Sequence, residues 1–364
     1  MSISKKLAVA IDATAFVDGR APGFNYYILS LLDGISKCMS VKIEVSLYVR
    51  EDQLLSFVHY KTCMRVIPIK ISNVMWRVLW QNIYLPLISS RYDMVIYPGN
   101  FAPFFSRSNY FLVVHDLNFL RYPENFSKFA YWFRRLNVKL SIRRSARCIA
   151  ISQVVKREIF DYVGREVDVI YNAVRKPVAG TMVERVIKQE DKWLIIIPSS
   201  LSVHKNIAPA YEASIEIAKK YDDVSFAFFG SWLPANFLNT VKHDRVNILG
   251  YVTDQDKAYL FENCDAVLVP SVYEGFGIPY VEAMLLDKCL ICSDISVARE
   301  VSEGYPYYIQ DPYGAREIFC AIESALSSRF VRNPFDKSLL DRYSVSSVAQ
   351  NYLNLIESEI SKSK

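Results

Sequence analysis

The stretch Ala266–Asp294 constrains the fold of this chain more than any other. A short apolar run, Ala266–Val269, stops at a proline, as a buried strand of a parallel sheet does before a loop. The loop carries two glycines, and Pro279 follows where a first helical turn tolerates proline, because the missing N–H has no partner there anyway. Tyr280–Leu286 is the expected helix and Cys289–Cys292 the next strand. The pattern predicts a strand–loop–helix–strand unit of an α/β sheet.

The same segment has the features of an anion site. A glycine loop at a helix start exposes backbone N–H groups, and the helix dipole favours negative charge. Glu274 lies in the loop with Gly275, Phe276 and Gly277, and Glu282 lies about one turn into the helix. Carboxylates accept hydrogen bonds, so they suit the hydroxyl groups of a ligand whose phosphate the glycines hold. A nucleotide sugar has both parts, whereas a solvated loop with an amphipathic helix is the simpler alternative.

The segment EGFGIP, followed by EAM, resembles the signature of the family-4 retaining glycosyltransferases of the GT-B fold. The resemblance implies an α/β protein with two Rossmann-like domains that face each other across a cleft. It also implies a C-terminal helix that crosses back to the N-terminal domain. In such enzymes Glu282 would hold the donor ribose, Glu274 the donor-sugar hydroxyls and Gly275–Gly277 the diphosphate.

The length of the chain indicates two domains, because 364 residues are more than a domain with a single hydrophobic core usually contains. A hydrophobic content of 51% with 22% charged residues is typical of a globular protein and excludes a disordered one. We expect an acceptor-binding domain over 1–174, a nucleotide-sugar domain over 175–345 and the returning helix over 346–364. The polar stretch Arg175–Asp191 is the expected linker.

In the first half, His115 follows the apolar run Tyr110–Val114. A side chain at the carboxyl end of a parallel strand points to the edge where open α/β sheets bind ligands, although a structural histidine is the alternative. In the resembled family this histidine lies near the transferred sugar. Gly23 precedes an amphipathic stretch, and a plain turn glycine is an equally good interpretation of it from the residues. The resemblance favours contact of Gly23 with the donor phosphates.

In the second half, Lys205 comes after the apolar run Trp193–Ile197 and directly before a helix expected over Ile207–Lys220. Lys205 is either a surface lysine or a residue whose ammonium binds a diphosphate, and the resemblance favours the second interpretation. Many relatives have an arginine five positions earlier, where this chain has Ser200. The resemblance therefore implies a weaker contact, through a hydroxyl group, at that point.

Tyr251 and Val252 follow the expected strand Val246–Gly250, where relatives contact the nucleobase. Asp254 and Asp256 form an Asp-x-Asp pair, which chelates a divalent metal in another glycosyltransferase fold class. Here the pair opens a helix, where acidic residues favour the dipole. We expect no metal and no other cofactor. The seven cysteines have no framework spacing, so neither zinc nor disulfides are expected.

Phe126–Arg147 has a helical pattern with aromatic and apolar residues on one side and basic residues, from Arg134 to Arg147, around the rest. Such a helix either lies on an anionic membrane surface or covers a domain core with a solvated face. The chain has no run of 18 apolar residues, so no spanning helix is expected. We expect a cytoplasmic protein that is peripheral on the inner face of the cytoplasmic membrane. Nucleic-acid binding is not expected, because no reader motif accompanies the basic residues.

The expected function is retaining, metal-independent transfer of a hexose to a glycan acceptor, lipid-linked, in bacterial surface polysaccharide (lipopolysaccharide or O-antigen) assembly. GDP-mannose is the first candidate donor and a UDP-sugar the second. A membrane-peripheral scaffold with a degenerate donor site is the alternative of another class. The expected site comprises His115, Glu274 and Lys205 as catalytic residues; Gly23, Ser200, Lys205, Gly275, Phe276 and Gly277 at the diphosphate; Glu282 at the ribose; and Tyr251 and Val252 at the base.

Overall fold

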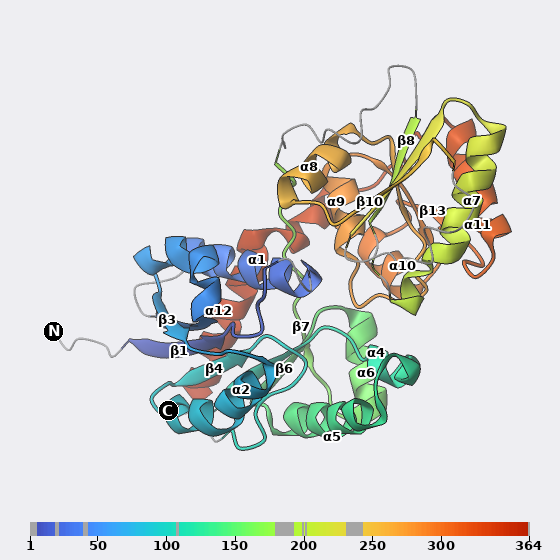
Figure 1. Ribbon diagram of the computed structural model, residues 1–364. Helices are drawn as coiled ribbons and strands as arrows, with labels where there is room; N and C mark the ends of the chain where they lie inside the picture. Colours follow the sequence, from blue (N-terminus) through green and yellow to red (C-terminus); the bar gives the residue numbers. More distant parts are fainter. Residues whose placement is uncertain are drawn as a thin grey trace. The chain divides into compact units, whose positions relative to one another are not determined.

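Two parallel β-sheets organise the chain (Figure 1). The structure is a computed structural model and describes residues 6–18, 22–38, 43–106, 109–178, 193–198, 200, 202–230 and 243–362. Contacts divide the chain into unit 1, Met1–Ala173 with Arg342–Lys364, and unit 2, Val174–Asp341. The sequence placed these boundaries after residues 174 and 345. Residues 179–191 of the expected linker lie outside the described residues.

Unit 1 has, in its described residues, a sheet of seven parallel strands in the order β3-β2-β1-β4-β5-β6-β7. The central strands β4 and β5 are buried along their whole length, as parallel strands are when helices cover both faces of a sheet. The strand order reverses between β1 and β4, so the loops that leave these strands diverge. The strands are β1 (Leu7–Asp12), β2 (Ile43–Arg50), β3 (Arg65–Ile69), β4 (Met94–Tyr97), β5 (Tyr110–Val114), β6 (Arg147–Ala150) and β7 (Asp168–Val169).

The helices of unit 1 include the last helix of the chain, which packs against the first, as the GT-B resemblance implied. The hydroxyls of Tyr27 and Tyr352 lie 2.7 Å apart at this contact, and Gly34 allows the two backbones to approach. The helical segments are α1 (Pro22–Cys38), η1 (Glu51–Thr62), α2 (Val74–Leu79), the π-helical η2 (Trp80–Tyr84), α3 (Leu85–Ser89), α4 (Asn118–Arg121), η3 (Pro123–Asn125), α5 (Lys128–Arg144), α6 (Gln153–Val163) and α12 (Val345–Lys362).

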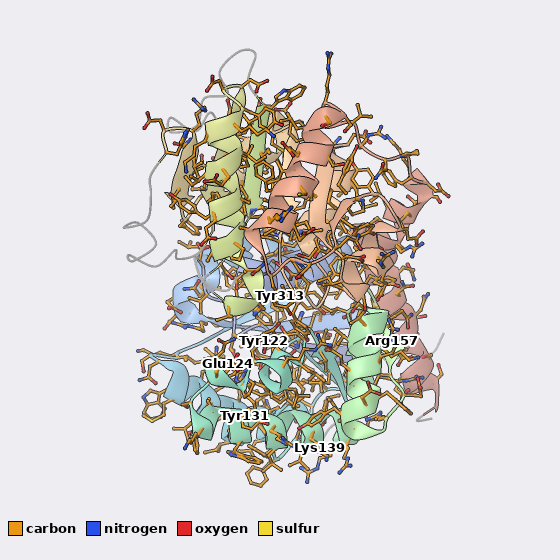
Figure 2. The ribbon with its side chains drawn as sticks, turned by 90° about the vertical axis from the view of Figure 1, so that its right-hand side faces the viewer. Tyr122, Glu124, Tyr131, Lys139, Arg157 and Tyr313 are labelled. Carbon is orange, nitrogen blue, oxygen red and sulfur yellow. The ribbon has the colours of Figure 1, made fainter. Side chains whose placement is uncertain are left out.

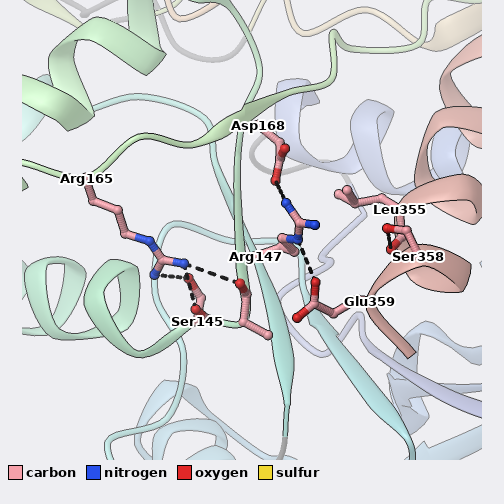
Figure 3. A network of polar contacts seen from close by, with 8 residues as sticks. Ser145, Arg147, Arg165, Asp168, Leu355, Ser358 and Glu359 are labelled. Carbon is pink, nitrogen blue, oxygen red and sulfur yellow. Dashed lines mark hydrogen bonds and ion pairs between the residues drawn. The ribbon is translucent and has the colours of Figure 1, made fainter. Parts of the chain in front are cut away.

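Arg147 corrects the expected basic helix. α5 ends at Arg144, because Ser145 is extended (φ −61°, ψ 141°) and the chain enters β6. The guanidinium of Arg147 binds Asp168 at 3.3 Å and Glu359 at 2.7 Å, and so ties β6 to β7 and to α12 (Figure 3). The prediction that Arg147 belongs to the basic helix was wrong.

The aromatic side of α5 faces away from the core. Phe129, Trp132 and Leu136 are 81%, 63% and 57% exposed. The buried residues of the helix are Asn137, Val138, Ser141 and Ile142, so the core-facing side is narrow and partly polar. No helix in the described part of the chain is long and apolar enough to cross a bilayer.

Unit 2 has, in its described residues, a sheet of six parallel strands in the order β10-β9-β8-β11-β12-β13. Its strands are β8 (Trp193–Pro198), β9 (Val224–Phe229), β10 (Val246–Gly250), β11 (Ala266–Val269), β12 (Cys289–Ser293) and β13 (Tyr307–Ile309). Its helical segments are η4 (Val203–Lys205), α7 (Ile207–Lys220), α8 (Asp254–Asn263), α9 (Ile278–Leu285), α10 (Ser296–Ser302) and α11 (Ala315–Ser327), and η6 (Lys337–Tyr343) follows them. The expected class of two parallel α/β domains is confirmed.

The α1–α12 contact predicts that Gly34→Ala destabilises unit 1. An added Cβ would lie 2.5 Å from the Val345 carbonyl oxygen and 2.6 Å from Cβ of Ala349, so the helices must separate. We expect a loss of about 1–3 kcal/mol in the free energy of unfolding, measured by urea denaturation. Gly314→Ala, which meets open space, is the control and should lose less than about 1 kcal/mol. Equal stability of Gly34→Ala and wild type would contradict this packing.

Candidate active site

The loop between β11 and α9 requires glycine at Gly277. This residue directly precedes α9 with φ +87°, in the left-handed region. A Cβ there would lie 2.2 Å from Cε2 of Tyr280, whose side chain is fully buried. Pro279 occupies the first turn of α9, and Phe276 is buried and anchors the loop. The Tyr280 N–H donates to the Gly277 carbonyl at 2.9 Å, and the start of a helix of this kind suits a bound anion.

Lys205 and Glu274 form an ion pair at the point where the strand order of unit 2 reverses. β8 and β11 are neighbours, and the loops that follow them leave in opposite directions. The Lys205 Nζ donates to Glu274 Oε1 at 2.6 Å, and both side chains are partly buried. The two loops are also joined by the backbone, because the N–H of Val272 donates to the His204 carbonyl at 2.8 Å. The structure thus joins two of the three expected catalytic residues.

Glu282 is buried within unit 2, in contact with a lysine that the sequence did not single out. Its Oε1 accepts a hydrogen bond from Lys257 Nζ at 2.6 Å. Burial raises the pKa of Glu282, and the charge and hydrogen bond of Lys257 oppose that rise. Sequence spacing carries no signal for this pair, because its members come from α8 and α9.

The other expected donor residues lie at the same edge of the unit 2 sheet. Ser200 follows β8 and is partly buried. Tyr251, exposed, and Val252, partly buried, follow β10 at the end of the strand order. All of these positions come after the carboxyl ends of parallel strands, which is where sheets of this kind bind ligands.

His115 lies at the carboxyl end of β5 and is held by the loop after β4. Its Nε2 lies 2.6 Å from the Pro98 carbonyl oxygen, and its backbone N–H donates to Asn100 Oδ1 at 2.7 Å. Because a carbonyl only accepts, Nε2 carries the proton. Burial lowers the pKa of His115 to about 4, so the imidazole is neutral near pH 7.

Gly23 is brought near His115 by the first turn of α1. Gly23 is exposed there, and the next residue, Phe24, makes an edge contact with the His115 ring at 5.8 Å between centroids. Tyr27 contacts the same ring at 4.6 Å. The two site residues expected in unit 1 therefore share one neighbourhood.

Residues 181–338 match the family model described as "Glycosyl transferases group 1". The matched residues make up most of unit 2. The O-antigen chain mannosyltransferase RfbU of Salmonella typhimurium is 27% identical over 207 residues, which are 55% of this chain and 56% of that protein. The serotype-specific mannosyltransferase WbdA of Escherichia coli is 26% identical over 240 residues, 59% of this chain and 29% of that protein. The matches span less than two thirds of these relatives.

Solved structures share the fold of the whole chain. Anabaena HepE, in complex with UDP and glucose, has a TM-score of 0.70 at 19% identity, over 97% of this chain and 100% of that one. WaaG, a glycosyltransferase involved in lipopolysaccharide biosynthesis, has a TM-score of 0.65 at 12% identity, over 98% of each chain. The expected relation to family-4 glycosyltransferases of the GT-B fold is confirmed.

Asp254 and Asp256 lie in the first turn of α8, where Asp256 takes part in the helix cap. Thr253 caps α8 by accepting from the Asp256 N–H at 3.1 Å, and Asp256 Oδ2 accepts from the Thr253 N–H at 3.3 Å. This reciprocal capping box occupies Asp256 in the way expected for the start of a helix. The expectation that no metal is required stays a prediction.

In unit 1, the sequence reasoning missed Asp12, at the carboxyl end of β1. Burial raises its pKa, and its oxygens accept from Thr14 Oγ1 at 2.6 Å and Gln81 Nε2 at 2.8 Å. The sequence signal that could have identified Asp12 is its position at the end of an apolar strand. The β1–β4 reversal places Asp12 at the switch point of unit 1.

The environment of His115 predicts a pH dependence of stability. Its folded pKa of about 4 lies below its ordinary value, so the unfolded chain binds the proton more tightly and acid favours unfolding. Between pH 7 and pH 5 the wild type should lose about 1–2 kcal/mol more of its free energy of unfolding than His115→Gln. Urea denaturation at both pH values measures this difference. His59→Gln, at an exposed histidine, should follow the wild type; if His115→Gln does too, the imidazole is not buried.

Proposed function

We propose that the protein is a retaining glycosyltransferase that moves a hexose from a nucleoside-diphosphate sugar to a glycan acceptor in surface polysaccharide assembly. The observation that carries this proposal is the contact of Lys205 with Glu274 at the switch point of a group 1 domain. A cation for a diphosphate and an acceptor for sugar hydroxyls lie 2.6 Å apart there.

The site is suited to stabilise a departing diphosphate. An oxocarbenium-like transition state places negative charge on the leaving group, and Lys205 with the N–H groups at the start of α9 meets that charge with little reorganisation. In this proposal the donor diphosphate replaces Glu274 as the partner of the Lys205 ammonium. The Glu274 carboxylate then accepts hydrogen bonds from the hexose hydroxyls. These groups act in place of a metal, and no cofactor takes part. The neutral His115 lies with the acceptor.

The proposed donor is GDP-mannose, with a UDP-sugar as the second candidate. Both curated relatives named above are mannosyltransferases, which supports mannose. The HepE structure contains UDP and glucose, which keeps the UDP-sugar in the comparison. Tyr251 and Val252, after β10, are the proposed base contacts.

The proposed acceptor is lipid-linked, and one face of unit 1 suits a membrane. Large exposed apolar side chains gather on α2, η2 and α3, on the loop after β4 and on α5. We call this set the apolar face: Met75, Trp76, Leu79, Ile83, Tyr84, Leu87, Phe105, Phe129, Trp132 and Leu136. The segments are continuous, because Phe104 N–H donates to Asn82 Oδ1 at 2.9 Å, the Phe104 ring contacts Phe133 at 5.7 Å and Arg144 donates to the Phe104 carbonyl at 2.9 Å.

The apolar face is flanked by positive charge. Lys128, Arg135, Arg143 and Arg144 of α5 are exposed. Lys139 and Tyr131 lie on the same helix, which Figure 2 shows at the lower margin of unit 1. Crossover connections are right-handed, so α2 and α5 cover the side of the sheet opposite α1 (Figure 1). Aromatic side chains with basic neighbours are typical of a surface that lies on anionic lipid.

The ion pair predicts that Lys205→Met and Glu274→Gln each reduce transfer at least about 100-fold, since in this proposal each change removes a group that contacts the donor in the transition state. The melting temperature should hardly change, because a partly exposed ion pair contributes at most about 1 kcal/mol. The donor for the assay is chosen by the thermal shift that GDP, UDP and their sugars produce. Product is then measured by chromatography, with and without EDTA.

Lys219→Met is the matched control, since Lys219 pairs with Glu216 on the exposed side of α7. It should transfer like the wild type. If both site variants fail to fold, the Lys205–Glu274 pair has a structural role and not a catalytic one. A loss of activity in EDTA would return Asp254 and Asp256 to consideration as metal ligands.

The apolar face predicts binding to vesicles of phosphatidylcholine with phosphatidylglycerol and weak binding to phosphatidylcholine alone. The double variant Arg135→Glu/Arg143→Glu should bind the anionic vesicles at least about tenfold more weakly, as should Trp132→Ser. Co-sedimentation measures both. Leu55→Ser, at an 88% exposed leucine outside the face, should bind like the wild type. Equal binding by all variants would rule the face out.

A further inference from the structure

One carboxylate oxygen of Glu282 accepts a hydrogen bond from the described residues, and the other does not. The residue is 1% exposed, and its Oε1 accepts from Lys257. Its Oε2 is also buried and has no hydrogen-bond partner among the described residues. Buried carboxylate oxygens without partners are uncommon in native proteins, because the lost hydration is not replaced. A hydroxyl group of a ligand is a partner of the right chemistry for this oxygen.

Lys257 is placed rigidly for its contact. The capping box at Thr253 and Asp256 orders the first turn of α8, and Lys257 follows directly. Its ammonium lies 5.6 Å from the centre of the Phe261 ring, one turn further along the helix. The Lys257 side chain is 26% exposed, whereas that of Glu282 is 2% exposed. α8 therefore presents a fixed cation to a carboxylate of α9.

Among the charged groups around Glu282, Lys257 contributes most to stabilising the ionised carboxylate. Burial is the largest influence and raises the pKa of Glu282. Lys257 lowers that pKa by its charge and its hydrogen bond, Asp254 raises it, and Arg175 lowers it slightly. Removal of Lys257 therefore moves Glu282 toward its protonated form.

We propose that Lys257 is a positioning residue for recognition of the donor ribose: it holds Oε1 of Glu282, so that Oε2 is presented, as part of an ionised carboxylate, to the ribose hydroxyls. This inference rests on the proposed function and on the expectation from the sequence that Glu282 binds the donor ribose. The carboxylate accepts from a 2′- or 3′-hydroxyl most strongly when it is charged. A nucleotide without the hydroxyl leaves that oxygen unpaired.

The test compares GDP and UDP with their 2′-deoxy and 3′-deoxy analogues by calorimetry at pH 6 and pH 8. The wild type should prefer the ribonucleotide over at least one of the two deoxy analogues about tenfold at both pH values, the size expected for a hydrogen bond to a charged group. Lys257→Met should lose most of that preference at pH 6 and regain part of it at pH 8, because higher pH favours the ionised carboxylate. Lys257→Arg should restore the wild-type behaviour, and Glu282→Gln should lose the preference at both pH values.

A purely structural role of Lys257 predicts something else, namely equal weakening of the ribo- and deoxyribonucleotides at both pH values, and that result overturns the inference. Full preference in Lys257→Met also overturns it and leaves the proposed function standing. A wild type that binds nucleotides but distinguishes neither deoxy analogue from the ribonucleotide removes the ribose role of Glu282 and the inference with it. A wild type that binds neither nucleotide overturns the donor site as well. Lys257→Gln serves if Lys257→Met does not fold, and Lys219→Met is the control.

Discussion

The reversal of strand order between β8 and β11 is the constraint on which the site of unit 2 depends. All strands of this sheet are parallel, so every loop that follows a strand emerges at the same edge. At the reversal, neighbouring loops leave in opposite directions. Lys205 and Glu274 come from the segments after these two strands and form a 2.6 Å ion pair across 69 positions of sequence. Their meeting is a consequence of topology.

The start of α9 shows how unit 2 combines packing with charge. Gly277 has a left-handed conformation, and the Tyr280 ring fills the space that a side chain there would need. One turn later, Glu282 is buried, and burial raises its pKa. A raised folded pKa means that Glu282 stabilises the fold when protonated and that this contribution is lost as pH rises. Ionisation of the buried carboxylate therefore costs stability, and Lys257 partly offsets that cost.

The two faces of the unit 1 sheet are covered by helices of different character. The side that carries α1 is closed by α12, through the Tyr27–Tyr352 hydroxyl contact and the close approach at Gly34. The ion pairs of Arg147 attach α12 to the edge of the sheet as well. On the side that carries α2 and α5, exposed aromatic residues lie beside basic ones. A membrane surface and the neutral, anchored His115 fit the same proposal, with the acceptor bound by unit 1.

The sequence by itself determined the fold class and most elements, because burial patterns and turn residues are local. Val246–Gly250, Ala266–Val269 and Ile207–Lys220 were predicted with the bounds that the structure has. Helix ends were less predictable: the expected helix 126–147 stops at Arg144, because Arg147 forms its contacts from a strand. Gly277, Glu274 and Glu282 were predictable as a set, since one continuous motif carries them. Only the tertiary structure paired Lys205 with Glu274 and Lys257 with Glu282 and turned the aromatic side of α5 outward, because these contacts join segments whose separation in sequence carries no periodic signal.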